Sequence, residues 1–156
     1  MTPDGISTED WDRVHEIAVE VVNASAIEDD VLCEHHTQRL FGILDELESV
    51  YGRIPSVLAT RADFTVEPAE AVSLHEEALI VATDPISSRL SLQSLIRLKI
   101  DERHDESSIL DLLHHLEKVT DFEEGDSDLE ELRELQAHFD RTRGHNKTVN
   151  PTADRL

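Results

Sequence analysis

The sequence has few of the residues that build disulfide-bonded, metal-bound or phosphate-binding sites. Cys33 is its only cysteine, which excludes an internal disulfide and a cysteine-rich metal site and suits a reducing compartment. Its five glycines stand far apart, so they cannot form a loop that cradles a phosphate, and no Gly-x-Ser-x-Gly motif marks a nucleophilic serine. We therefore expect neither nucleotide binding nor serine-hydrolase chemistry, and no cofactor.

Long apolar runs are also missing. No stretch reaches the roughly 18 consecutive apolar residues that a membrane-spanning helix needs. Residues 1–12 are acidic and lack the apolar centre of an export signal. These features predict a cytoplasmic protein without a membrane partner.

Basic residues are scarce relative to acidic ones. The chain has 14 Lys and Arg against 35 Asp and Glu, which gives a formal net charge of −21. A charge of this sign repels the phosphates of nucleic acids and attracts basic proteins. The expected partner is therefore a basic protein and not a nucleic acid, although a polyanion can also fill a basic groove as a mimic of nucleic acid.

Helix-forming residues are abundant, and apolar residues recur at helical spacing in six segments. Capping residues mark most of their ends: Ser7 with Asp10, Ser25 with Glu28, Asp84, Asp105, Ser127 with Glu130, and Gly52 at a C-terminus. We expect helices over about 8–23, about 26–51, from Pro68 to just before Asp84, after Asp84, after Asp105, and over about 128–141. No strand has a comparable signal.

This pattern predicts an all-α, single-domain bundle of about six mostly antiparallel helices over residues 1–140. Its expected core consists of Trp11, Leu40, Leu44, Leu47, Leu79, Leu95, Leu113 and Leu116. The later helices start near residues 68, 85, 106 and 127, a spacing of about twenty residues that would also suit a short helical-repeat array. Narrow apolar stripes leave a monomer and a homodimer both open.

Residues 141–156 form a basic, polar C-terminal tail with four basic residues and one acidic residue. We interpret it as a flexible terminus, with an arm lying on an acidic face as the alternative.

Nine histidines stand among many acids, and several have the spacing of metal ligands on a helix. No specific metal motif occurs, so we predict no metal site. Helical projection places His36 and His75 on apolar faces. Buried histidines are usually structural, but acid–base chemistry would be possible if His36, His75 and an acid such as Asp63 met in one pocket.

The long connection between the second and third expected helices is the first candidate for a binding site. It brings Arg53 and Arg61 close in sequence to Tyr51, Thr60 and Asp63. Arginine binds carboxylates and phosphates through its forked guanidinium group. The structural alternative is that Arg61 pairs with an acid on a neighbouring helix and fixes the connection in place.

Together these features predict a small acidic cytosolic protein-interaction module that binds a basic partner, for example as an inhibitor or an immunity or antitoxin-like factor. One alternative is a small metal-dependent or acid–base enzyme that uses His36 or His75. A second is a helical-repeat scaffold.

Overall fold

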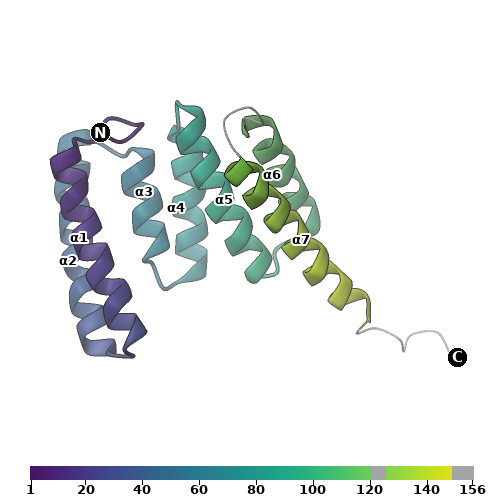
Figure 1. The fold of residues 1–156 in the computed structure, drawn as a ribbon, viewed down its shortest axis with the longest axis horizontal. Coiled ribbons are helices and arrows are strands. Elements are labelled where there is room, and N and C mark those ends of the chain that lie inside the picture. The colour runs from purple at the N-terminus through teal and green to yellow at the C-terminus, as the bar shows by residue number, and fades with distance from the viewer. Residues whose placement is uncertain (121–125, 149–156) are drawn as a thin grey trace, which may run out of the picture. The chain divides into compact units, whose positions relative to one another are not determined.

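The computed structural model describes residues 1–120 and 126–148, and every regular element within these residues is a helix. The chain forms two compact units, Met1–Ser91 and Leu92–Leu156, and the boundary between them falls inside the fifth helix. Within the described residues there are seven helices (Figure 1): α1 (Thr8–Ala26), α2 (Asp30–Tyr51), α3 (Pro55–Asp63), α4 (Pro68–Val81), α5 (Pro85–Asp101), α6 (Glu106–Val119) and α7 (Asp126–Thr148). The prediction of an all-α fold is confirmed, with one helix more than expected.

Three predicted N-caps form as side chain to backbone hydrogen bonds. Ser7 Oγ accepts the N–H of Asp10 (3.1 Å), Asp84 Oδ1 accepts the N–H of Ser87 (2.8 Å), and Asp105 Oδ2 accepts the N–H of Ser108 (2.8 Å). At the other end of α2, Gly52 adopts a φ of 84° and donates its N–H to the carbonyl of Glu48. A left-handed residue of this kind is a common helix stop, and glycine adopts it without a steric penalty.

The predicted cap formed by Ser25 and Glu28 is wrong. Burial of Ala24 at 1% exposure against the core carries α1 through Ser25, so the helix turns only after Ala26. Glu28 then takes a left-handed φ of 57°, and α2 is capped by Asp29, whose carboxylate accepts the N–H of Leu32 at 3.0 Å. An aspartate just before the first turn is a strong N-cap. Helix α2 therefore begins at Asp30, four residues later than predicted.

Helix α3 occupies the connection that lacked a clear pattern in the sequence. Pro55 stands at its first turn, and Val57 and Leu58 are completely buried. Ile54, at the N-cap position, supplies no side-chain hydrogen bond. The helix is too short to show a clear apolar period, and its cap comes from a residue distant in the sequence. Neither a periodic apolar stripe nor a local capping residue therefore marks it.

Helix α7 is longer than predicted at its C-terminal end. It passes Arg141 and Gly144 and ends at Thr148, so the boundary expected between residues 140 and 141 lies inside it. An ion pair between Arg143 Nε and Glu106 Oε2 of α6 at 3.0 Å ties this extension to the rest of the second unit. At the other end α7 begins at Asp126, so Ser127 lies inside the helix and not at its cap. Residues 121–125, between α6 and α7, and residues 149–156 of the predicted basic tail lie outside the described residues.

In the first unit, α1 packs along α2 and α3 along α4, as pairs joined by short turns (Figure 1). The core cluster consists of Ile6, Val14, Ile17, Leu40, Leu44, Leu47 and Val57. Trp11 and Leu79, both predicted to be core residues, are only half-buried. The other six predicted core leucines are buried: Leu40, Leu44 and Leu47 here, and Leu95, Leu113 and Leu116 in the second unit.

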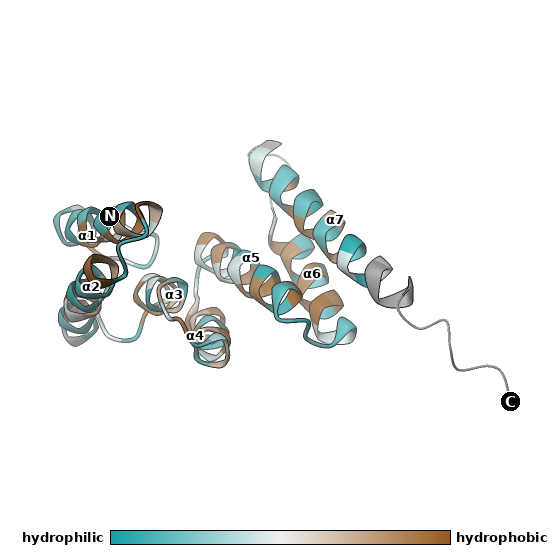
Figure 2. Cartoon of the chain, turned by 90° about the horizontal axis from the view of Figure 1, so that it is seen from below, coloured by the Kyte–Doolittle hydropathy of each residue, from teal (hydrophilic) through white to brown (hydrophobic). Residues whose placement is uncertain are grey.

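In the second unit, α6 and α7 are in contact, and Leu113 and Phe139 are buried between them. Leu116 of α6 and Leu132 and Leu135 of α7 are also buried. Figure 2 shows hydrophobic residues along α6, whereas most of the described part of α7 is hydrophilic. When two amphipathic helices pack through their apolar sides, polar residues lie along the edges of the contact. None of the helices in the described ranges is both long and apolar enough to cross a bilayer.

Candidate functional site

The predicted binding residues lie in the first unit. Among them, Tyr51 at the end of α2 contacts residues at the start of α1. Its hydroxyl donates to Asp10 Oδ2 at 2.7 Å and accepts the N–H of Ser7 at 3.4 Å. The hydrogen bond from Tyr51 is the main reason that the pKa of Asp10 is lowered from its ordinary value of 3.8, with a second contribution from Ser7. Tyr51 therefore fixes the start of α1 against the end of α2.

Arg53 is held by two carboxylates of its own unit. Its Nε and one terminal nitrogen donate to the two oxygens of Glu77 on α4 at 2.6 and 2.7 Å, and the other terminal nitrogen donates to Glu48 on α2 at 2.7 Å. These bonds raise the pKa of the guanidinium group and lower the pKa of Glu77 below its ordinary 4.5. The guanidinium group of Arg53, which was expected to bind a ligand, instead connects α2 to α4.

Arg61 makes the contacts of the structural alternative. It donates to Asp45 of α2 at 2.6 Å, lies 3.8 Å from Glu48, and covers the ring of Phe41 at 5.4 Å from the ring centre. Only 19% of the side chain is exposed. Arg61 thus holds α3 on α2, while neighbouring Thr60 is half-buried on α3.

The two histidines predicted to face inward have different surroundings. His75 of α4 is 2% exposed, and its Nε2 lies 3.2 Å from Asp63 at the end of α3. Its Nδ1 has no hydrogen-bond partner among the residues described by the structure. His36 is half-buried and lies with its Nδ1 3.1 Å from Glu20 of α1. The hypothesis of one pocket required a shared acid, but each histidine meets a different carboxylate.

A grouping of three or more His, Cys, Asp or Glu side chains suited to a metal ion does not occur in the described part of the chain. The His75 ring is also too deeply buried to touch a substrate in this conformation. Its contact with Asp63 therefore connects α3 to α4 and has the geometry of a structural pair.

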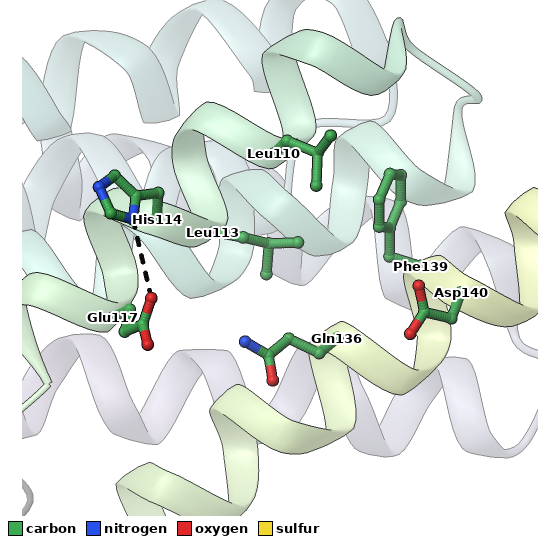
Figure 3. A pocket seen from close by; sticks show the side chains of 7 residues that line it. All are labelled: Leu110, Leu113, His114, Glu117, Gln136, Phe139 and Asp140. Atoms are coloured by element: carbon green, nitrogen blue, oxygen red, sulfur yellow. Dashed lines mark ion pairs between the residues drawn. The ribbon is translucent and has the colours of Figure 1, made fainter.

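The second unit contains an open groove of about 300 Å³ between α6 and α7, shown in Figure 3. Its residues follow helical spacing on both helices, so each helix contributes one face. They are Leu110, Leu113, His114 and Glu117 of α6 and Gln136, Phe139 and Asp140 of α7.

The groove has an apolar floor and a polar rim. Leu113 and Phe139 are 6% and 4% exposed, while Leu110 stands at the edge with 45% exposure. His114 Nδ1 lies 3.7 Å from Glu117 Oε2, and Asp140 lies toward the other end of the groove (Figure 3). This arrangement can accept a small apolar group with positive charge beside it, because both rim acids are exposed.

Sequence reasoning did not find this groove. The pattern of α6 identified Leu113 as a core residue, but Leu110 belongs to the edge of the same apolar stripe. The available signal was the run from Leu110 through Leu113 and His114 to Glu117, in which one helix face changes from apolar to charged. Which part of α7 faces this run depends on the contact between the helices, which a single sequence does not determine.

A second concave region of about 390 Å³ lies beside α7 and is largely polar. Two of its lining side chains, Arg97 and His138, are already in ion pairs. His138 Nε2 lies 2.8 Å from Asp101, and Arg97 is paired with Glu131. Because Arg97 and His138 of its lining are engaged by these acids, this region is a weaker candidate than the groove between α6 and α7.

Searches with this chain found no matching protein-family model, no matching curated protein and no matching solved structure.

Proposed function

We propose that this protein is an interaction module whose acidic surface binds a basic protein partner. The observation that supports this proposal is that many of its few basic residues form ion pairs within the chain. In the described part of the chain, six arginines form ion pairs with carboxylates of the same chain: Arg13, Arg39, Arg53, Arg61, Arg97 and Arg143. These six arginines thus connect helices of the same unit, and many of the acids are exposed.

The outer face of α1 illustrates this excess. Glu9, Asp12 and Glu16 are exposed and are spaced so that they follow one side of the helix. With a net charge of −21, such surfaces produce a negative potential that attracts a basic protein before contact. Attraction of this kind accelerates association and weakens as salt is added.

The test is affinity capture with the tagged full chain at low and at high salt, followed by identification of the captured proteins. We expect a specific basic protein that is retained at low salt and eluted by high salt. A variant with Glu9→Gln, Asp12→Asn and Glu16→Gln should associate with that protein more slowly, with its helical content unchanged.

Two results would contradict the proposal. One is the absence of any specific basic partner at low salt. The other is a partner whose affinity does not change with salt. If the captured protein is an enzyme or a toxin, an assay of its activity with and without this chain decides whether the module inhibits it.

A further inference from the structure

The groove between α6 and α7 combines the two properties that a site for a basic partner requires. Its floor, formed by Leu113 and Phe139 with Leu110 at the edge, offers apolar surface. Its rim carries the carboxylates of Glu117 and Asp140, which Figure 3 shows near opposite ends.

We propose that this groove holds an apolar side chain of the basic partner, and that Glu117 and Asp140 bind lysine or arginine residues next to that side chain. The proposal rests on the function proposed above and names the place and the chemistry of the contact. An apolar anchor in a pocket with a charged rim is a common arrangement at the centre of protein interfaces.

The groove is large enough to admit a side chain of a partner. At about 300 Å³ it lies at the lower end of the range for pockets that enclose whole small-molecule ligands. It is open along its length, so a side chain can enter while its backbone remains outside. Gln136, also on the rim, can donate to or accept from that backbone with its amide group.

The charge of the rim selects among possible occupants. A second copy of this chain would bring another net charge of −21 toward Glu117 and Asp140, and the repulsion disfavours it. A basic segment gains attraction at both ends of the groove while its apolar residue leaves water. The groove therefore favours a segment in which lysine or arginine flanks a leucine-like side chain.

Two synthetic peptides of equal length and charge test this inference. Both carry lysine at the same positions and serine elsewhere, except that one peptide has a single leucine between two lysines where the other has serine. Binding is measured at low salt with the full chain. We expect the leucine peptide to bind about tenfold more tightly, the effect of burying one aliphatic side chain.

Variants then locate the contact. Leu110→Ser should remove most of the preference for the leucine peptide, whereas Leu90→Ser, at a leucine of α5 that is 53% exposed, should leave it unchanged. Asp140→Asn should weaken both peptides more than Asp111→Asn, because Asp111 is exposed on α6 but does not line the groove. In spectra of the labelled protein, the leucine peptide should shift the methyl signals of Leu110 and Leu113.

The outcomes separate the two proposals. If both peptides bind equally and Leu110→Ser has no effect, the groove is not the contact site, while salt-sensitive binding still supports an interaction module. If neither peptide binds at low salt, the groove proposal fails, while the proposed function is decided by the capture experiment with the full chain. Equal losses in Leu110→Ser and Leu90→Ser would also overturn the groove, since the effect would not be local.

Discussion

Asp4 caps helix α3 by accepting two hydrogen bonds from Ser56. The backbone N–H of Ser56 donates to Oδ2 at 2.6 Å, and its hydroxyl donates to Oδ1 at 2.8 Å. Completely buried Ile6 and a hydrogen bond from its N–H to Thr2 Oγ1 hold the N-terminal segment in place. A segment before the first helix thus supplies the cap that α3 lacks locally.

We expect Asp4→Ala to lower the free energy of unfolding by about 1 kcal/mol, the usual effect of removing an N-cap. Asp4→Asn keeps one side-chain acceptor and should lose less. The measurement is urea unfolding followed by the fluorescence of Trp11, the only tryptophan, which packs on the core of the first unit. Asp12→Ala, at an exposed site of α1, is the control. Equal effects of Asp4→Ala and Asp12→Ala would show that the cap contributes nothing.

The pair of Arg53 and Glu77 should make stability depend on pH in the acid range. Because the folded pKa of Glu77 is lowered, its contribution is present above the ordinary value of 4.5 and is lost as the pH falls through the lowered pKa. Both side chains are more than a third exposed, so the contribution at neutral pH should be below about 1 kcal/mol. Glu77→Gln should therefore lower the free energy of unfolding at pH 7. As the pH falls below 4.5, the stability of the variant should decrease less steeply than that of the wild type. Urea midpoints across this range, compared with Glu16→Gln on α1, provide the check; parallel curves for wild type and Glu77→Gln would contradict it.

Tyr51→Phe should raise the pKa of Asp10 toward its ordinary 3.8, because the hydroxyl that favours the ionised carboxylate is removed. A titration of the side-chain carboxyl carbons by NMR measures this directly, with Asp12 in the same spectra as the internal control. The stability contributed by this bond is present above the ordinary pKa and is lost as the pH falls through the lowered one. An unchanged titration of Asp10 in the variant would mean that the hydroxyl does not control it.

Asp63→Ala should destabilise the first unit by about 1–3 kcal/mol, because it leaves the buried ring of His75 without its only described partner. Asp63→Asn retains an oxygen at this position, so it should cost less. Urea unfolding of the two variants, followed by circular dichroism, gives the comparison. If both variants match the wild type, the contact between Asp63 and His75 does not stabilise the α3–α4 pair.

Much of the fold could be predicted because helix ends and apolar stripes are local signals. Ser7, Asp84 and Asp105 cap helices as expected, and Gly52 ends α2. The failures have a physical pattern. Helix α3 depends on Asp4, which is distant in sequence, and α1 continues past Ser25 because Ala24 is buried by tertiary packing.

The candidate sites were harder to predict for the same reason. Arginine at positions 53 and 61 suggested a ligand, but the acids that meet these side chains, Glu77 and Asp45, are on other helices. The groove between α6 and α7 depends on which sides of two helices face each other. Local spacing therefore identified the elements, while the partners of their side chains depended on tertiary contacts.

The division of the chain inside α5 has a practical consequence for dissecting it genetically. A truncated protein ending at Ser91 would keep only about two turns of α5, and isolated helices shorter than about 12–15 residues are marginal in water. A truncation placed before Asp84 would leave α1 to α4 whole and would remove α5 together with its N-cap. Deletion mapping of the partner's binding region is therefore best done with end points in the turns beside α5, because a loss of binding then reflects a missing surface and not a cut helix.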